Sequence, residues 1–268
     1  TATMTKKKSK LCPIFISKIT ANGVNILIKK VLTVAGSDCS GGAGIQADIK
    51  TITAHKMYAM SAITALTAQN TTGVYGVLDA SPEFVGSEID CIFQDIVPDA
   101  VKIGMVSNSG IINKIAEKLT EYKAKNIVVD PVMVSTSGSK LLSDDAMTAL
   151  INNLLPIGDI ITPNLPEAEA LCGFAIKSEE DMIKAAEIIG KNIDGAVLVK
   201  GGHLTETAND LLFDHGKAIW LTGERVDNPN THGTGCTLSS AIACNLAAGF
   251  DMPVAVKNAK AYITGALK

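Results

Sequence analysis

The chain has 268 residues, of which 47% are apolar, so it is long enough for one large α/β domain or two small ones with a full core. Its formal net charge of −3 provides no broad basic field for a nucleic acid, and no stretch reaches the roughly 18 uninterrupted apolar residues of a membrane span. Six cysteines are scattered without a C-x-x-C pair and only four histidines are present, so neither a zinc knuckle nor a disulfide framework is indicated, and free thiols are typical of a reducing cytoplasm.

The first segment, residues 1–27, is expected to lie outside the main fold as an N-terminal extension or tag remnant. It begins with basic residues, but its apolar run LCPIFI is short and interrupted by Pro13 and then by Lys18, unlike the core of a signal peptide. Because no repeat, low-complexity segment or linker follows, residues 28–268 are expected to form a single domain.

From about residue 28, short β-branched runs alternate with amphipathic stretches. Strands are predicted at 30–36, 61–69, 99–105, 126–131, 159–164 and 195–202, and helices at 43–56, 81–95, 107–124, 143–155, 165–173 and 178–191. This alternation predicts an α/β fold with a mostly parallel central sheet and helices on both faces. The segment 211–221 predicts a small antiparallel hairpin, and two final helices follow the glycine-rich stretch after it.

Polar and glycine residues stand where the predicted strands end, and ligands of such sheets bind beyond the carboxyl ends of the strands. In chain order these residues are GSDCSGGAG, Gln69-Asn70, Gly104-Met105, Asp130-Pro131, Asn164 and Lys200-Gly201-Gly202. The sequence therefore predicts one ligand site at this edge of the sheet.

The loop HGTGCTLSS, residues 232–240, is neither a Walker A loop nor a dinucleotide fingerprint, because Leu238 stands where the third glycine belongs. If a helix begins near Cys236, its free N–H groups and its dipole make an anion site. A thiol at such a helix N-terminus is expected to have a lowered pKa. The alternative is a tight turn with a core cysteine.

The loop GSDCSGGAG precedes a predicted helix whose apolar stripe is formed by Ile45, Ile49 and Ile52. Asp48 borders that stripe, so its carboxylate needs a partner, either a ligand hydroxyl or a backbone N–H. A solvated acid at the edge of the helix is the alternative. A Rossmann site is disfavoured because the loop lacks the G-x-G-x-x-G register.

Two further motifs point to phosphate chemistry. Lys200 ends an apolar strand before two glycines, so it is expected either to neutralise phosphate charge in a cleft or to extend along the surface. Asn164 and Glu167 lie in a turn that leads into a helix. Glu167 is expected to be a first-turn acid that favours the helix dipole or, alternatively, to organise magnesium through water.

The segments GSDCSGGAGIQADIKT, TALTAQNTTGV, IGM, VVDPVM, TPNLPEAEAL, VKGGH and HGTGCTLSSAIA occur in this order over roughly residues 31–265. Together they resemble the hydroxymethylpyrimidine/phosphomethylpyrimidine kinases of thiamine biosynthesis, in the ribokinase-like superfamily. The resemblance implies a ribokinase-like fold, a magnesium-ATP site and usually a homodimer. It also implies two phosphoryl transfers, first to the hydroxymethyl oxygen of 4-amino-5-hydroxymethyl-2-methylpyrimidine and then to the resulting monophosphate.

The resemblance also assigns site residues. It implies a pyrimidine pocket of Gly36, Asp48, Thr67, Gln69 and Met105, an anion hole of Gly233, Gly235 and Cys236, nucleotide contacts from Asn164, Thr231, His232, Thr234 and Lys200, and magnesium-side groups Asp130 and Glu167. Much of the superfamily has aspartate where Cys236 stands, acting as a base, whereas cysteine is the signature of the pyrimidine kinases and of related pyridoxal kinases. We therefore expect Cys236 to assist as a base while the loop N–H groups stabilise the transferring phosphoryl group.

Two departures and several alternatives accompany this resemblance. The N-terminal extension has no counterpart in the family pattern, and the chain ends at TGALK where that pattern continues with a short tail.

The alternative functions are a pyridoxal or pyridoxine kinase, a non-catalytic sensor of the pyrimidine or nucleotide, and a dinucleotide-dependent enzyme. The loops 71–76 and 134–140 are candidate flaps over the substrate.

Overall fold

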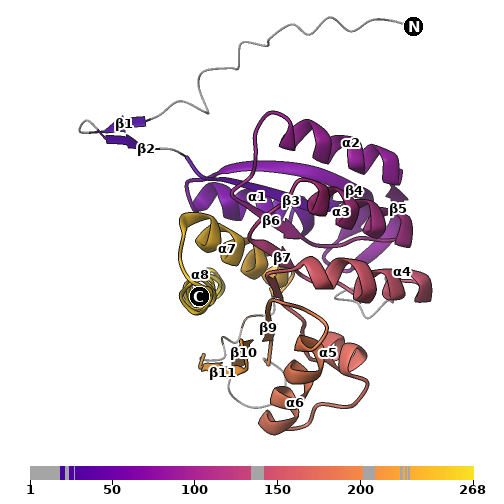
Figure 1. The fold of residues 1–268 in the computed structure, drawn as a ribbon, viewed down its shortest axis with the longest axis vertical. Coiled ribbons are helices and arrows are strands. Elements are labelled where there is room, and N and C mark those ends of the chain that lie inside the picture. The colour runs from indigo at the N-terminus through magenta and orange to yellow at the C-terminus, as the bar shows by residue number, and fades with distance from the viewer. Residues whose placement is uncertain are drawn as a thin grey trace, which may run out of the picture.

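The computed structural model describes residues 19–21, 24–26, 28–133, 142–201, 209–223, 226, 228 and 230–268. Its centre is a nine-stranded sheet in the order β11-β10-β9-β8-β7-β6-β3-β4-β5 (Figure 1). The six strands from β4 to β9 in this order pair in parallel, while β5 and the β10–β11 hairpin pair antiparallel at the two edges. The predicted fold class, including the hairpin near residues 211–221, is therefore confirmed.

The elements follow the predicted alternation closely. The strands of the large sheet are β3 (Lys30–Asp38), β4 (Tyr58–Asn70), β5 (Gly73–Asp79), β6 (Ala100–Ile103), β7 (Ile127–Val129), β8 (Ile160–Ile161), β9 (Ala196–Val199), β10 (Asp210–Asp214) and β11 (Lys217–Leu221). The helices are α1 (Gly44–Ala54), α2 (Pro82–Phe93), α3 (Ser109–Glu121), α4 (Asp144–Ala149), α5 (Leu165–Cys172), α6 (Glu179–Gly190), α7 (Thr234–Ala248) and α8 (Met252–Leu267).

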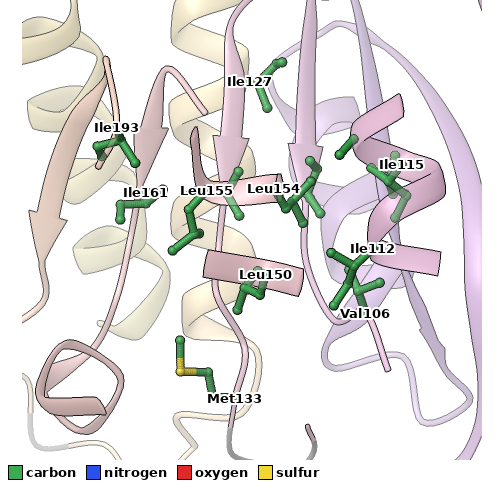
Figure 2. Close-up of a cluster of buried hydrophobic side chains, with 14 of the residues drawn as sticks. Val106, Ile112, Ile115, Ile127, Met133, Leu150, Leu154, Leu155, Ile161 and Ile193 are labelled. Atoms are coloured by element: carbon green, nitrogen blue, oxygen red, sulfur yellow. The ribbon is translucent and has the colours of Figure 1, made fainter. Parts of the chain in front are cut away.

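Both faces of the sheet are buried because alternate residues of each central strand enter opposite cores. On β3, Leu32 and Val34 belong to the cluster under α2 to α6, whereas Val31 belongs to the cluster under α1, α7 and α8. Figure 2 shows part of the first cluster, where Ile127 on β7 and Ile112 on α3 lie among the labelled apolar side chains. The β-branched runs therefore form central strands rather than half-exposed ones.

Three sequence expectations require correction or qualification. The segment 71–76 was expected to be a flap, but residues from Gly73 onward form edge strand β5, whose glycines and exposed side chains concealed it. The predicted helix 143–155 is broken after α4 into a π-helical turn, Leu150–Leu154, and a 3-10 turn, Leu155–Ile157. The other candidate flap, 134–140, lies outside the described residues.

Within the N-terminal segment, β1 (Ile19–Ala21) and β2 (Val24–Ile26) form a separate two-stranded sheet, so they add no strand to the large one. Within the described part of the chain, no helix combines the length and the apolar character needed to cross a bilayer.

Candidate active site

The glycine loop quoted above opens α7, and Gly233 is its N-terminal capping residue. Gly233 has a φ of 85°, a left-handed conformation that suits glycine. No side chain caps the helix, and among the described residues none accepts a hydrogen bond from the backbone N–H groups of Gly235 and Cys236. Unsatisfied N–H groups at the positive end of a helix dipole favour an anion, so the geometry agrees with the predicted anion hole.

The two glycine-rich loops interlock. The Asp38 carboxylate at the end of β3 accepts hydrogen bonds from the N–H groups of Ser40, Gly42 and Ala43, and its Oδ2 lies 2.9 Å from His232 Nε2. A Cβ added at Gly42 would stand only 2.4 Å from His232 Cδ2, so the loops touch without room for a side chain.

The same carboxylate is strongly stabilised in its charged form. Burial opposes ionisation, but the hydrogen bonds from His232 and Ser40 outweigh it and lower the pKa of Asp38 to about 2. His232 therefore contacts the first loop, a role that sequence reasoning missed because nothing in the spacing joins residues so far apart. Its expected contact with the nucleotide stays a prediction.

The thiol of Cys236 lies half-buried in the first turn of α7 and accepts a hydrogen bond from the Gly44 backbone N–H. Burial raises the pKa of Cys236 to about 11, although the positive charge of Lys102 acts in the opposite direction. The expectation of a lowered thiol pKa at this helix N-terminus is therefore wrong for the protein without ligands. Desolvation is the larger effect here, and most of the thiol is protonated near neutral pH.

Lys200, which follows β9, forms an ion pair with Asp130 beyond the end of β7, with 3.1 Å between Nζ and Oδ1. Burial opposes ionisation of Asp130, but Lys200 and Lys102 hold the pKa of this carboxyl below its ordinary value. A Cβ on Gly235 would lie 3.5 Å from Asp130 Oδ2 and 3.7 Å from Lys200 Nζ. The half-buried lysine thus stands beside the anion hole rather than extending along the surface.

Asn164 and Glu167 form a capping box at the start of α5. The Glu167 carboxylate accepts from the Asn164 N–H at 2.8 Å, and the Asn164 side chain accepts from the Glu167 N–H at 2.9 Å. Burial raises the pKa of Glu167 to about 7, the Asp130 charge adds to this effect, and Lys200 opposes it. The expectation of a first-turn acid is confirmed, but this acid is buried.

The acidic side chains of the site can be compared with the ligands that Mg²⁺ requires. Among the described residues there is no group of three or more His, Cys, Asp or Glu side chains that could hold a metal ion. Asp130 and Glu167 still place two carboxylates near Lys200, and burial is the main cause of the raised pKa of Glu167, to which the Asp130 charge adds. Two carboxylates suit Mg²⁺ that takes its other ligands from water and phosphates.

The remaining nucleotide residues surround the second loop. The Thr234 hydroxyl donates to the Thr231 carbonyl oxygen at 2.9 Å, and Thr231 itself is exposed. The backbone bridge between Asn164 and Lys200 keeps the capping box next to the lysine. These residues therefore lie in one region, as the sequence predicted.

Four residues expected in the pyrimidine pocket gather at the ends of β3, β4 and β6. A Cβ on Gly36 would lie 3.3 Å from Met105 Sδ, and Thr67 Oγ1 lies 3.0 Å from Gln69 Oε1. Thr67 also contacts the Ser37 carbonyl oxygen at 2.9 Å, which joins β4 to β3. The four residues are thus adjacent, and Gln69 remains partly exposed.

Asp48, also expected in this pocket, has no exposed surface. Its carboxylate forms an ion pair with Lys102 at 2.9 Å and accepts from the hydroxyls of Thr33 at 2.6 Å and Ser240 at 2.8 Å. The partner of Asp48 is therefore neither a ligand nor a backbone N–H. Sequence reasoning missed Lys102, because a lysine within the apolar run of β6 gives no local sign that it pairs with a carboxylate on α1.

Comparison with known proteins gives consistent findings. A family model described as phosphomethylpyrimidine kinase matches residues 38–268. A hydroxymethylpyrimidine/phosphomethylpyrimidine kinase of Rhizobium meliloti (strain 1021) is 51% identical over 88% of this chain and 89% of its own length. The crystal structure of phosphomethylpyrimidine kinase from Clostridium difficile 630 has a TM-score of 0.80 and 48% identity, covering 90% of this chain and all of that one. A pyridoxal kinase from Staphylococcus aureus in complex with AMP-PCP has a TM-score of 0.84 and 37% identity, covering 91% of this chain and 89% of that chain.

Proposed function

Because the chain belongs to the phosphomethylpyrimidine kinase family, we propose that it phosphorylates 4-amino-5-hydroxymethyl-2-methylpyrimidine and then its monophosphate, with ATP as the donor. The chain is a kinase with a ribokinase-like fold, and its relatives act in thiamine biosynthesis. The observation that carries the proposal is the pair of N–H groups on Gly235 and Cys236, which have no acceptor among the described residues and lie beside the half-buried Lys200.

The donor and acceptor sides of this site meet at one loop. Cys39, in the loop after β3, contacts the Gln69 carbonyl oxygen at 3.1 Å, and Gly44, at the other end of that loop, contacts the Cys236 thiol. A pyrimidine held by Gln69 would therefore lie near the residues that face the phosphates. An amide such as Gln69 offers both a donor and an acceptor to an aminopyrimidine edge.

Each chemical role follows from the charge and hydrogen bonds of a residue. The N–H groups of Gly235 and Cys236 bind the equatorial oxygens of the transferring phosphoryl group, and Lys200 neutralises part of its charge. In its thiolate form, Cys236 accepts the proton of the substrate hydroxyl as the new phosphorus–oxygen bond forms and the bond to ADP breaks. Because burial raises the pKa of the thiol, this form is a small fraction near neutral pH, and a loose transition state requires only a weak contribution from the base. Mg²⁺, held with Asp130 and Glu167, would neutralise phosphate charge when bound.

The nucleotide contacts support ATP as the donor. A structural neighbour with 37% identity binds AMP-PCP, a non-hydrolysable analogue of ATP. We assign Asn164, Thr231, Thr234 and Lys200 to the nucleotide side, since they surround the opening of α7. Gly36, Thr67, Gln69 and Met105 are assigned to the pyrimidine side.

The test measures each transfer separately. The protein is incubated with magnesium-ATP and either the alcohol or its monophosphate, ADP release is followed, and the products are identified by mass. ADP release with both acceptors, giving the monophosphate and then the diphosphate, is the expected result. Release with neither acceptor would refute the proposed function.

A pyridoxal kinase is the second candidate, because several similar structures are pyridoxal kinases and two of them are complexes with pyridoxal. Pyridoxal also carries a hydroxymethyl group on a heteroaromatic ring. The identity to pyrimidine kinases is higher, 51% against 36% for the pyridoxal complex, which favours the pyrimidine. Phosphorylation of pyridoxal in the same assay would support the second candidate.

We also infer a homodimer, formed through the exposed apolar face of the β4–β5 edge. Leu66 on β4 is 52% exposed, and its cross-strand partner Leu78 on β5 is 68% exposed. Tyr75 is 71% exposed on the same edge strand. Exposed large apolar side chains at a sheet edge are a liability in a monomer and fit a second copy of the chain. Among the described residues five cysteines are free thiols, which fits a reducing cytoplasm.

A further inference from the structure

The Thr67 hydroxyl makes two contacts near Gln69 but has only one proton to donate. Thr67 Oγ1 lies 2.9 Å from the Ser37 carbonyl oxygen and 3.0 Å from the side-chain oxygen of Gln69. Both neighbours are acceptors in this orientation, but a threonine hydroxyl has one proton and can donate only once. One of the two contacts must therefore be made differently.

The carboxamide of Gln69 can resolve the conflict, and the carbonyl cannot. A half-turn of the carboxamide exchanges its oxygen and its NH₂ group, which have nearly the same size, whereas a backbone carbonyl only accepts. With the NH₂ group toward Thr67, the hydroxyl donates to Ser37 and accepts from Gln69. Both contacts are then satisfied, while the opposite orientation satisfies only one.

This orientation has a consequence for the ligand. One N–H of Gln69 is used by Thr67, so the oxygen and the second N–H remain as an acceptor beside a donor. We propose that Thr67 determines substrate specificity by positioning Gln69. Its hydroxyl fixes the order of acceptor and donor that the Gln69 carboxamide presents to the ring. The matching ring edge has an amino group next to an unprotonated ring nitrogen, as a 4-aminopyrimidine has. This inference rests on the proposed function and adds the basis for selecting the amine.

The backbone of Gln69 is held as firmly as its side chain. The Cys39 thiol donates to the Gln69 carbonyl oxygen at 3.1 Å and accepts from the Gln69 N–H at 3.3 Å. The ladder between β4 and β5 shifts register between Ala68 and Gln69, an irregularity that is common beside functional sites. Thr67 is only 6% exposed, so water cannot easily replace its hydroxyl. The side-chain orientation is therefore the remaining freedom, and Thr67 controls it.

The experiment compares two acceptors in the Thr67→Val variant. One acceptor is 4-amino-5-hydroxymethyl-2-methylpyrimidine, and the other is its 4-oxo analogue, whose ring N–H and carbonyl reverse the order of donor and acceptor. We expect the ratio of kcat/KM for the amine to that for the oxo compound to fall about five- to tenfold, the value of one hydrogen bond. The KM for ATP stays unchanged. Thr67→Ser, which keeps the hydroxyl, restores the wild-type ratio.

A matched control separates this role from a loss of stability. Thr51 on α1 is 3% exposed, and its hydroxyl donates to the Ala47 carbonyl oxygen at 2.8 Å, so Thr51→Val removes a comparable buried hydrogen bond away from Gln69. This control keeps the wild-type ratio. A Thr67→Val ratio within twofold of wild type refutes the role of Thr67. A wild-type chain that does not phosphorylate the amine refutes the proposed function itself, which is a separate outcome.

Discussion

The buried ion pair between Lys102 and Asp48 gives the largest stability effect that the structure predicts. Both side chains have no exposed surface, and the Asp48 carboxylate also accepts from Thr33 on β3 and Ser240 on α7. Burial disfavours the charge of Lys102, but Asp48 raises the pKa of this lysine far above its ordinary value, so the lysine keeps its charge. The pair thus connects β6, α1, β3 and α7 beneath the anion hole.

Lys102→Met leaves the Asp48 carboxylate buried without its counter-charge. Removing one partner of a buried pair costs about 3–5 kcal/mol of unfolding free energy. For a domain of this size each kcal/mol corresponds to roughly 2–4 °C, so the melting temperature falls by roughly 6–20 °C. The double variant Lys102→Met with Asp48→Asn removes both charges and keeps an acceptor for the hydroxyls, so it is more stable than Lys102→Met alone.

The assay is equilibrium unfolding in urea together with thermal unfolding, at one protein concentration because association also contributes. The control is Lys114→Met, which breaks the surface pair with Glu117 at 2.7 Å and costs at most about 1 kcal/mol. A decrease in unfolding free energy of less than about 1 kcal/mol for Lys102→Met would refute the reasoning, since an unpaired buried carboxylate destabilises the folded state by more than this. A double variant no more stable than the single one would refute it as well.

Three further predictions concern the base, the buried acid and the edge strand. Cys236→Ala lowers kcat by about 10²-fold or more between pH 6 and 9 if the thiol assists as a base; nearly full kcat in steady-state assays would leave the anion hole acting alone. Burial raises the pKa of Glu167 from 4.5 to about 7 in the folded protein, so the folded state binds this proton more tightly than the unfolded state. The unfolding free energy of the wild type therefore falls by about 3 kcal/mol as the pH rises from the unfolded pKa to the folded one. Glu167→Gln removes most of that fall, which urea unfolding at pH 5 and pH 8 measures; an unchanged pH dependence would contradict the assignment. Leu78→Asp shifts sedimentation at micromolar concentration toward the monomer, while Val97→Asp, at an exposed site outside that strand pair, does not; a wild-type chain that is monomeric would contradict the proposed interface.

The sheet and most helices could be predicted because their signals are local. The β-branched runs of β3 and β7 supply apolar residues to both cores, and Ser81, Asn108 and Asp251 cap their helices with their side chains. The edge strand β5 gave no such signal, because its residues from Tyr75 to Asp79 are exposed. Its pairing depends on β4 alone.

The sequence predicted which residues form the site, but not which of them contact one another. The glycine loop, Lys200 and Asn164 lie together as expected, because the carboxyl ends of parallel strands meet at one edge. The Lys102–Asp48 pair joins residues 54 positions apart, and helical periodicity shows only that Asp48 borders an apolar stripe. The pKa of Cys236 depends on desolvation by the surrounding fold, which the position of the thiol in its helix does not determine.

The most direct test of the central claim is the product mass after incubating the protein with magnesium-ATP and equimolar hydroxymethylpyrimidine and pyridoxal. Gln69, Lys200 and the N–H groups of Gly235 and Cys236, which have no acceptor among the described residues, together predict the result. A pyrimidine monophosphate rises and then declines as the diphosphate accumulates, with little pyridoxal phosphate. Pyridoxal phosphate as the main product, or no phosphorylated product at all, would contradict the account.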